Sequence, residues 1–325
     1  MTPARASSRS VPSPDVDAST EPVRPRLVVG VCTYRRPALL ADLLRAVGEA
    51  AAVVAERVDC SVTVVDDDPA GSAAEIVASA PISIPVRYVP LGARSISAAR
   101  NALVEAAVVE ADLLAMIDDD CRPGSRWLAT LLDVAEDTAA DMVSGTVEYR
   151  AEPGGPPWLA DEGFLGVTVR YRDREEPAFG CTANSLFRSA WLRAHPEVRF
   201  EERFGRLGGE DMTFFAAAKR TGARLRWSAG ATVVERVPPE RCTLRYMVVK
   251  NFWYGNNQVV LHLHNRDYGR VRLALQAGRR ALEVVASGVA GIVPGRRVRP
   301  RRTLCDLAFC AGKGLGVAGL RVAHR

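Results

Sequence analysis

Two runs of three aspartates, Asp66–Asp68 and Asp118–Asp120, contain the side chains of this chain that are best suited to chemistry. In the second run, the carboxylates of Asp118 and Asp120 occupy alternate positions, so after a strand both can face one cavity and bind a divalent cation through oxygen. Mg²⁺ or Mn²⁺ held in this way keeps several waters and bridges to substrate phosphates. Three adjacent acids also repel one another unless a cation is present. The alternative interpretation is a solvated acidic turn before Pro123.

The first aspartate run suits recognition of a nucleoside, because a carboxylate at a strand end can accept hydrogen bonds from a base or a ribose hydroxyl. Asp is also common in β–α turns for local reasons, so these three residues alone leave both interpretations open. The segment Thr33–Pro37 favours a nearby anion, since it places Arg35 and Arg36 at the start of a predicted helix. Arg100, inside a later predicted helix, is either a second anion contact or an exposed helix residue.

Glu210 and Asp211 follow two glycines at the start of another predicted helix. Acids in the first turn are favoured by the helix dipole, by about 0.3–1 kcal/mol, so this position does not by itself require a function. The alternative is a general base that deprotonates an acceptor hydroxyl. The sequence lacks the motifs of several other protein classes. It contains no GxGxxG after the first strand, no GxxxxGK[ST], no HExxH and no GxSxG, so dinucleotide-binding, P-loop, zinc-protease and serine-hydrolase functions are weakly supported.

Apolar, β-branched segments alternate with helical segments, a pattern typical of βαβ units and a mostly parallel sheet. The expected strands cover 27–31, 62–65, 86–89, 113–117 and 142–147, and the expected helices cover 37–56, 73–79, 95–109 and 127–136. Beyond them we expect a helix over 210–219 and short strands at 224–227 and 232–234. Right-handed crossovers put every strand's carboxyl end at one edge of the sheet. Both aspartate runs would then meet at the edge where ligands bind in open α/β sheets, so we predict a Rossmann-like α/β fold.

The composition is that of a globular protein, with 48% apolar and 25% charged residues. The seven cysteines form no CxxC pair, which favours a reducing compartment over a disulfide framework or a zinc ribbon. We find no secretory signal and no continuous apolar run long enough to span a bilayer. Residues 1–25 are rich in Ser, Pro and Arg, which predicts a disordered N-terminal tail.

Charge is distributed unevenly along the chain. Residues 270–325 contain twelve Lys/Arg and two acids, a net charge of +10, which leaves −5 on residues 1–269. The apolar stretches 282–293 and 304–320 are too short or too interrupted to span a membrane, but with flanking arginines they could lie in an anionic membrane interface. A helical cap on the preceding domain is the alternative. Nucleic-acid binding is not expected, because the arginine run lacks interleaved aromatic residues.

Taken in order, six segments resemble the family 2 glycosyltransferases, which are inverting enzymes with the GT-A fold. The matching segments are Val29–Pro37, Val64–Asp68, Ala99–Asn101, Ile117–Asp120, Gly180–Asn184 and Gly208–Asp211. The likeness spans residues 27–255. We therefore expect a glycosyltransferase domain over 26–260, with a nucleotide-binding half at 26–147 and an acceptor half at 148–260. A basic helical region, 261–325, follows it.

The resemblance implies a role for each matching residue. Contacts to the nucleotide sugar are implied for Thr33, Arg35, Arg100, Asp118, Asp119 and one of Asp66, Asp67 and Asp68. The remaining roles are a DxD site for Mg²⁺ or Mn²⁺ at Asp118 and Asp120, a catalytic base at Asp211, and an acceptor side at Asn184 and Glu210. The implied reaction moves one sugar from a nucleotide-diphosphate sugar to a hydroxyl of a glycan, glycolipid or polysaccharide precursor, with inversion.

The chain also departs from the family pattern. Many relatives carry a His shortly before a segment like Val237-Pro238-Pro239, where this chain has Val234 and Glu235, so no His ligand is available there. The QxxRW signature of processive synthases is missing, which implies single transfer. The expected location is cytoplasmic, either free or peripheral on the inner face of the cell membrane.

Two other functions stay open. One is a sugar-phosphate nucleotidyltransferase, which shares the architecture but usually carries a Gly-rich basic loop after the first strand. The other is a non-catalytic, nucleotide-binding scaffold, since intact motifs do not prove turnover.

Overall fold

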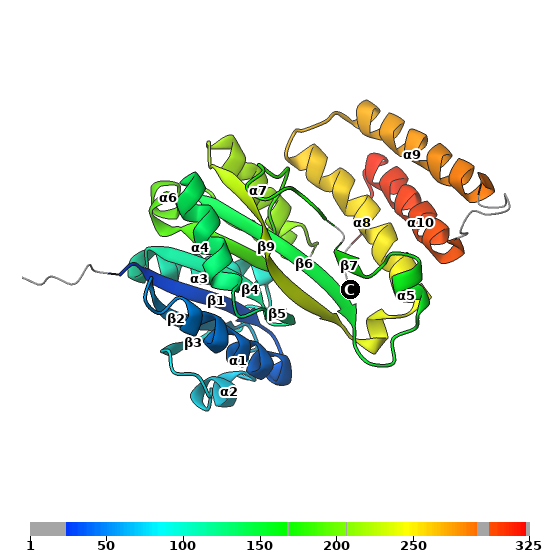
Figure 1. Cartoon of the computed structure of the whole chain (residues 1–325). Coiled ribbons are helices and arrows are strands. Elements are labelled where there is room, and N and C mark those ends of the chain that lie inside the picture. The colour runs from blue at the N-terminus through cyan, green and yellow to red at the C-terminus, as the bar shows by residue number, and fades with distance from the viewer. Residues whose placement is uncertain (1–23, 168, 206, 291–298, 323–325) are drawn as a thin grey trace, which may run out of the picture.

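The computed structural model describes residues 24–167, 169–205, 207–290 and 299–322, without the side chains of 288–290. Of the tail expected at 1–25, all but residues 24 and 25 lie outside the described residues. Within the described chain, a twisted sheet forms the centre and a three-helix unit forms one end (Figure 1).

The described residues form one nine-stranded sheet. Its strands are β1 (Arg26–Thr33), β2 (Asp59–Asp66), β3 (Val86–Pro90), β4 (Leu113–Asp118), β5 (Cys121–Pro123), β6 (Met142–Ala151), β7 (Gly166–Val167), β8 (Asn184–Arg188) and β9 (Leu225–Val237). Their order is β3-β2-β1-β4-β8-β6-β9-β5, with β7 beside β6. Strands β3, β2, β1 and β4 are parallel, whereas β8 runs antiparallel to both β4 and β6. The expected mostly parallel α/β fold is confirmed.

Helices cover both faces of this sheet. They are α1 (Pro37–Val53), α2 (Ala74–Ala78), α3 (Ile96–Glu110), α4 (Trp127–Thr138), α6 (Ser189–Ala194) and α7 (Glu210–Arg220). The short helix α5 (Trp158–Asp161) packs near the ends of β6 and β9 instead. Alternate residues of β1 point to opposite faces. Leu27, Val29 and Val31 pack with α1, α2 and α4, whereas Val28 packs with α3, α6 and α7. Burial of both faces explains why the strands consist of nearly continuous apolar residues.

Local sequence places two helix starts at one edge of the sheet. Pro37 occupies the first turn of α1, where its missing N–H costs nothing. Ser95 caps α3, because its side chain accepts a hydrogen bond from the backbone N–H of Ala98. The turns after β1 and β3 therefore bring both helices up at the carboxyl ends of the parallel strands.

The structure corrects several expectations. Strand β8 was not predicted, and together with β5 and β7 it runs against its neighbours, so the strand ends do not all lie at one edge. The two short strands expected at 224–227 and 232–234 are one strand, β9, with a register shift opposite Gly145 and Thr146. Sequence periodicity fails here because the bulge interrupts the alternation of a single long strand.

Three helices form the C-terminal unit, α8 (Leu244–His264), α9 (Arg270–Ala290) and α10 (Pro300–Val317). Helices α8 and α10 approach backbone to backbone, since a Cβ at Gly255 would lie 1.9 Å from the carbonyl oxygen of Phe309. Helix α9 lies at the outer edge of this unit (Figure 1). No helix among the described residues is long and apolar enough to cross a membrane. The boundary expected between 260 and 261 falls inside α8, and residues 291–293 of the expected apolar stretch lie outside the described residues.

Candidate active site

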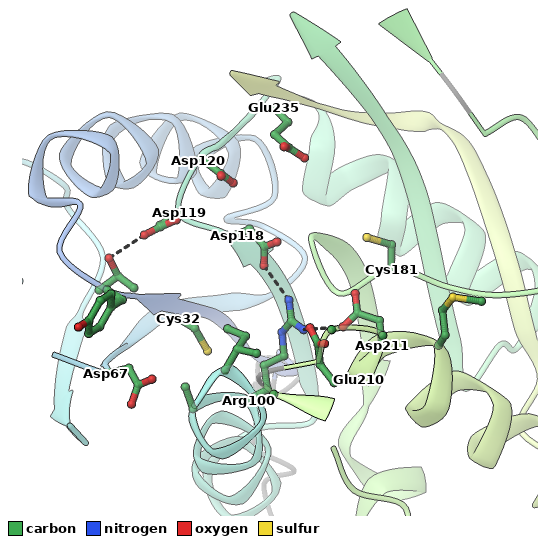
Figure 2. Close-up of a pocket in the computed structure, with 18 of the residues that line it drawn as sticks. Cys32, Asp67, Arg100, Asp118, Asp119, Asp120, Cys181, Glu210, Asp211 and Glu235 are labelled. Atoms are coloured by element: carbon green, nitrogen blue, oxygen red, sulfur yellow. Dashed lines mark hydrogen bonds and ion pairs between the residues drawn. The ribbon is translucent and has the colours of Figure 1, made fainter. Parts of the chain in front are cut away.

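A cavity of about 880 Å³ opens where β1 and β4 end (Figure 2). Eight of the residues predicted from sequence line it: Thr33, Asp67, Arg100, Asp118, Asp119, Asp120, Glu210 and Asp211. Four others are not part of this lining: Arg35, Asp66, Asp68 and Asn184. The fold therefore brings most of the predicted residues together from segments far apart in sequence.

Asp119 and Asp120, which follow β4, accept hydrogen bonds from two side chains that precede α1. The hydroxyl of Thr33 donates to Oδ2 of Asp119 at 2.8 Å. Nη1 of Arg36 donates to Oδ1 of Asp119 at 2.8 Å and to Oδ2 of Asp120 at 3.0 Å. Parallel pairing of β1 with β4 produces this contact, because it sets Cys32 beside Asp118 at the strand ends.

Burial raises the pKa of all three of these carboxyls. Arg100 opposes this effect at Asp118, and Arg36 opposes it at Asp119 and Asp120. Excess negative charge in a partly dry cavity favours a cation or a proton. The described residues contain no set of three His, Cys, Asp or Glu side chains arranged to hold a metal by themselves. A site built from Asp118 and Asp120 fits Mg²⁺ or Mn²⁺, which commonly take one or two carboxylates and complete their coordination with water and substrate phosphate.

Arg100 joins the two sides of the cavity. Its guanidinium is buried and donates to Asp118 at 3.3 Å, to Glu210 at 2.5 Å and to Asp211 at 2.6 Å (Figure 2). Burial disfavours its charge, but the carboxylates of Asp211, Asp118 and Glu210 outweigh burial and raise its pKa. Arg100 is therefore a permanent cation between three acids.

Asp211 lies in the first turn of α7 and is oriented from three directions. Its Oδ1 accepts from Arg100 and, at 2.8 Å, from the hydroxyl of Thr182. Its Oδ2 accepts from the backbone N–H of Thr182 at 3.2 Å. A carboxylate oxygen has two lone-pair sites, so Oδ2 has acceptor capacity beyond this one bond. Burial raises the pKa of the neighbouring Glu210 carboxyl.

The first aspartate run divides into different environments. Asp66 is fully buried and accepts from the backbone N–H groups of Asp68 and Ala73 and from the hydroxyl of Tyr88. Asp68 pairs with Arg35 at 3.2 Å. Asp67 alone lines the cavity, and its Oδ1 is buried without a hydrogen-bond partner among the described residues.

One predicted residue is corrected by its surroundings. Asn184 was expected on the acceptor side, but it is fully buried in the sheet. It accepts from the indole N–H of Trp127 at 2.8 Å and donates to the carbonyl oxygens of Thr146 and Ala231 at 2.9 and 2.7 Å. These bonds tie β8 to β6, β9 and α4, so Asn184 holds the core together.

The cavity also contains residues that the predicted site omitted. Those with charged or aromatic side chains include Arg36, Glu235, Arg241, Trp253 and Tyr254. The Thr33–Pro37 segment already pointed to Arg36. Glu235 lies beside the second aspartate run because β9 pairs with β5, which sets it opposite Cys121 (Figure 2). Burial, reinforced by the charge of Asp120, raises the pKa of Glu235 to about 7. Trp253 and Tyr254, both on α8, reach the cavity through tertiary packing, which the sequence pattern does not encode.

Comparison with known sequences gives two matches. Residues 28–195 match the sequence model of a family described as Glycosyl transferase family 2. Over 231 residues the chain is 35% identical to the succinoglycan biosynthesis protein ExoM of Rhizobium meliloti (strain 1021), an alignment that covers 70% of this chain and 72% of that protein.

Many solved structures share the architecture, and two of them serve as examples. The mannosyltransferase PcManGT from Pyrobaculum calidifontis, in complex with GDP-Man and Mn²⁺, gives a TM-score of 0.57 at 17% identity, covering 91% of this chain and 88% of that chain. TarS 1-349 of S. aureus, in complex with UDP, gives 0.51 at 15% identity, covering 91% and 92%. At these identities the likeness concerns the fold, and it confirms the expected GT-A-type fold.

Proposed function

The chain belongs to glycosyltransferase family 2, and we propose that it moves one sugar from a nucleotide-diphosphate sugar to a hydroxyl acceptor, with inversion and with a divalent cation. One observation carries this proposal: Arg100 binds both Asp118 at the end of β4 and Asp211 at the start of α7. The carboxylate that we assign to the donor site and the carboxylate that we assign as the base thus lie in one cavity. Family membership favours a transferase over the nucleotidyltransferase and the scaffold considered above.

The donor would lie across the ends of β1 and β4. Asp67 lines the cavity, and its carboxylate would accept a hydrogen bond from a base or a ribose hydroxyl. Arg36 and the start of α1 favour the diphosphate. Asp118 and Asp120 would hold Mg²⁺ or Mn²⁺, and Asp119 positions Thr33 and Arg36. When bound, the cation offsets the charge that develops on the leaving nucleoside diphosphate.

Asp211 would act as the general base. As the acceptor oxygen forms its bond to the anomeric carbon, the bond from that carbon to the diphosphate breaks, and the hydroxyl proton passes to the carboxylate of Asp211. Arg100 and Thr182 fix the orientation of that carboxylate. A single displacement from the face opposite the leaving group inverts the anomeric configuration. Glu210, which binds the same guanidinium, lies on the acceptor side.

The acceptor is proposed to be a saccharide. Likeness to a succinoglycan biosynthesis protein supports a cell-envelope polysaccharide precursor, either a free glycan or a lipid-linked one. The proposed location is the cytoplasm, with the enzyme peripheral on the inner face of the cell membrane. The aromatic rings of Trp253 and Tyr254 on α8 line the part of the cavity left for the acceptor.

Donor binding tests the proposal directly. Thermal unfolding would be followed with UDP-, GDP- and dTDP-sugars, each with Mn²⁺ or with EDTA. A ligand at 100 times its Kd stabilises by about 2.7 kcal/mol, so one nucleotide class should raise the melting temperature only when metal is present. Asp120→Asn should abolish this rise, whereas Asp133→Asn, at a partly exposed position on α4, should keep it. Folded protein that responds to no donor would contradict the proposed donor site.

A further inference from the structure

Helix α9 carries two opposite apolar faces, of which only one is packed. Leu273, Ala277 and Val284 are buried on one face of this helix, which packs against α10. The outer face exposes four large apolar side chains, Val271 (76% exposed), Leu275 (70%), Leu282 (73%) and Val285 (53%). Their spacing of four, seven and three residues places all four on one stripe of the helix. Within the part of the chain that the structure describes, no element covers this stripe.

The same helix is positively charged. Its described residues include Arg270, Arg272, Arg279 and Arg280 against a single acid, Glu283. Helical geometry puts Arg272 and Arg279 along one border of the apolar stripe, since they follow Val271 by one and eight positions. Long basic side chains beside exposed apolar ones are typical of helices that lie in a membrane interface.

The charge of the rest of the chain favours the same partner. Residues 1–269 carry −5 and residues 270–325 carry +10. An anionic surface therefore attracts the C-terminal unit and repels the body, which orients the molecule with α9 toward the surface. An antiparallel α9–α9 dimer is disfavoured, because its two-fold axis would bring the arginine borders of both copies close together.

We propose that the outer face of α9 lies in the headgroup region of an anionic bilayer, with Val271, Leu275, Leu282 and Val285 inserted and the arginines at the phosphates. Its purpose rests on the proposed function, because a transferase held at a bilayer can reach a lipid-linked acceptor. The contact itself involves no residue of the cavity described above.

Vesicle flotation tests this surface with the full-length chain. We expect binding to phosphatidylcholine vesicles that contain phosphatidylglycerol and little binding to pure phosphatidylcholine vesicles, with the difference weakened by salt. Leu275→Ser combined with Leu282→Ser should weaken binding by about tenfold or more. The matched control is Val109→Ser on α3, a residue that is 79% exposed, and it should bind as wild type does. Arg272→Gln with Arg279→Gln should reduce both the binding and its salt dependence.

The outcomes separate this inference from the proposed function. Absent vesicle binding by wild type, or unchanged binding by the leucine variant, would overturn the membrane assignment. The membrane assignment would also be overturned if light scattering showed that wild type is a dimer and the leucine variant is a monomer, because a second copy would then occupy the stripe. The donor-dependent rise in melting temperature is measured on the same samples, and it should be equal in wild type and the leucine variant. Loss of vesicle binding with a retained donor response would leave the transferase proposal intact.

Discussion

Nη1 of Arg100 lies 2.6 Å from Oδ1 of Asp211, although the two residues are 111 positions apart in the chain. Nη2 of the same guanidinium lies 3.3 Å from Oδ1 of Asp118. One buried cation therefore links the carboxylate at the end of β4 to the carboxylate at the start of α7. The arrangement keeps acids close together that would otherwise repel one another.

Asp211→Asn should abolish transfer while donor binding persists. An amide of the same size cannot accept the proton of an acceptor hydroxyl, and loss of a general base typically costs 10²–10⁴-fold in rate. The measurement is product formation with the donor identified by thermal unfolding. Asp137→Asn, at an exposed position on α4, is the control and should be as active as wild type. Transfer by Asp211→Asn at more than a tenth of the wild-type rate would show that another group is the base.

Arg100→Met should destabilise the fold by about 3–5 kcal/mol, because it leaves three carboxylates without their buried partner. Arg45→Met removes an exposed ion pair with Asp42 and should cost at most about 1 kcal/mol. Without the cation, the pKa of the Glu210 carboxyl rises further above its unfolded value, so stability falls as pH rises through that folded pKa. The deficit of Arg100→Met, measured by chemical denaturation, should therefore grow from pH 5 to pH 8. A constant deficit would contradict this electrostatic account.

Asp66→Asn and Asp67→Asn should have opposite effects. Asp66 accepts three hydrogen bonds in the core, so its variant should lose about 1–3 kcal/mol of stability. At Asp67 burial raises the carboxyl pKa despite the backbone N–H groups of residues 93–95, so an amide should cost little or stabilise. That variant should instead weaken binding of the nucleoside diphosphate by about tenfold, the loss of one good hydrogen bond. Calorimetry and chemical denaturation measure the two effects, and equal losses of stability would contradict the division.

Glu235→Gln should change the pH dependence of stability. The folded pKa of Glu235 is about 7 against an ordinary value of 4.5, so the folded state binds the extra proton between these values and wild-type stability falls as pH rises through this window. Glu235→Gln has no titrating group at this position and therefore does not lose stability in this window. In EDTA it should equal wild type near pH 4.5 and be more stable by about 1–3 kcal/mol at pH 8. The control is Glu56→Gln, at an exposed position, which should show no such pH-dependent difference from wild type. The same absence of a difference in Glu235→Gln would mean that the Glu235 carboxyl is well solvated.

Gly208→Ala should destabilise more than Gly222→Ala. Both glycines have positive φ, +74° and +87°, and alanine in that region costs about 1–2 kcal/mol. Only at Gly208 would the new Cβ also collide, 2.4 Å from the ring of Trp253, whereas Gly222 has open space. Overpacking adds about 1–3 kcal/mol, so the two variants should differ by that amount in chemical denaturation. Equal losses would mean that the Trp253 ring moves freely.

Much of the structure of residues 26–147 was predictable because its determinants are local. The apolar runs around Val29 and Val64 indicate strands buried on both faces, and Pro37 and Ser95 mark helix starts through their backbone chemistry. Parallel βαβ units then place the residues after those strands at one edge. The order of the motifs resembles that of the family, and this resemblance predicted that Asp118, Asp120 and Asp211 belong to one site.

The fold class, the transferase family and eight of the 25 residues that line the cavity could therefore be predicted from the sequence. Tertiary packing separates the polar residues that line the cavity from those that support the core. Asn184 belongs to the core because groups of α4, β6 and β9 satisfy its hydrogen bonds. Asp66 belongs to it because the loop after β2 and the hydroxyl of Tyr88 satisfy its oxygens, whereas Asp67 lines the cavity. The pairing of β9 with β5 brings Glu235 to Asp120, and packing of α8 brings Trp253 to Gly208. These relationships arise between segments far apart in the chain, and no local propensity or periodicity encodes them.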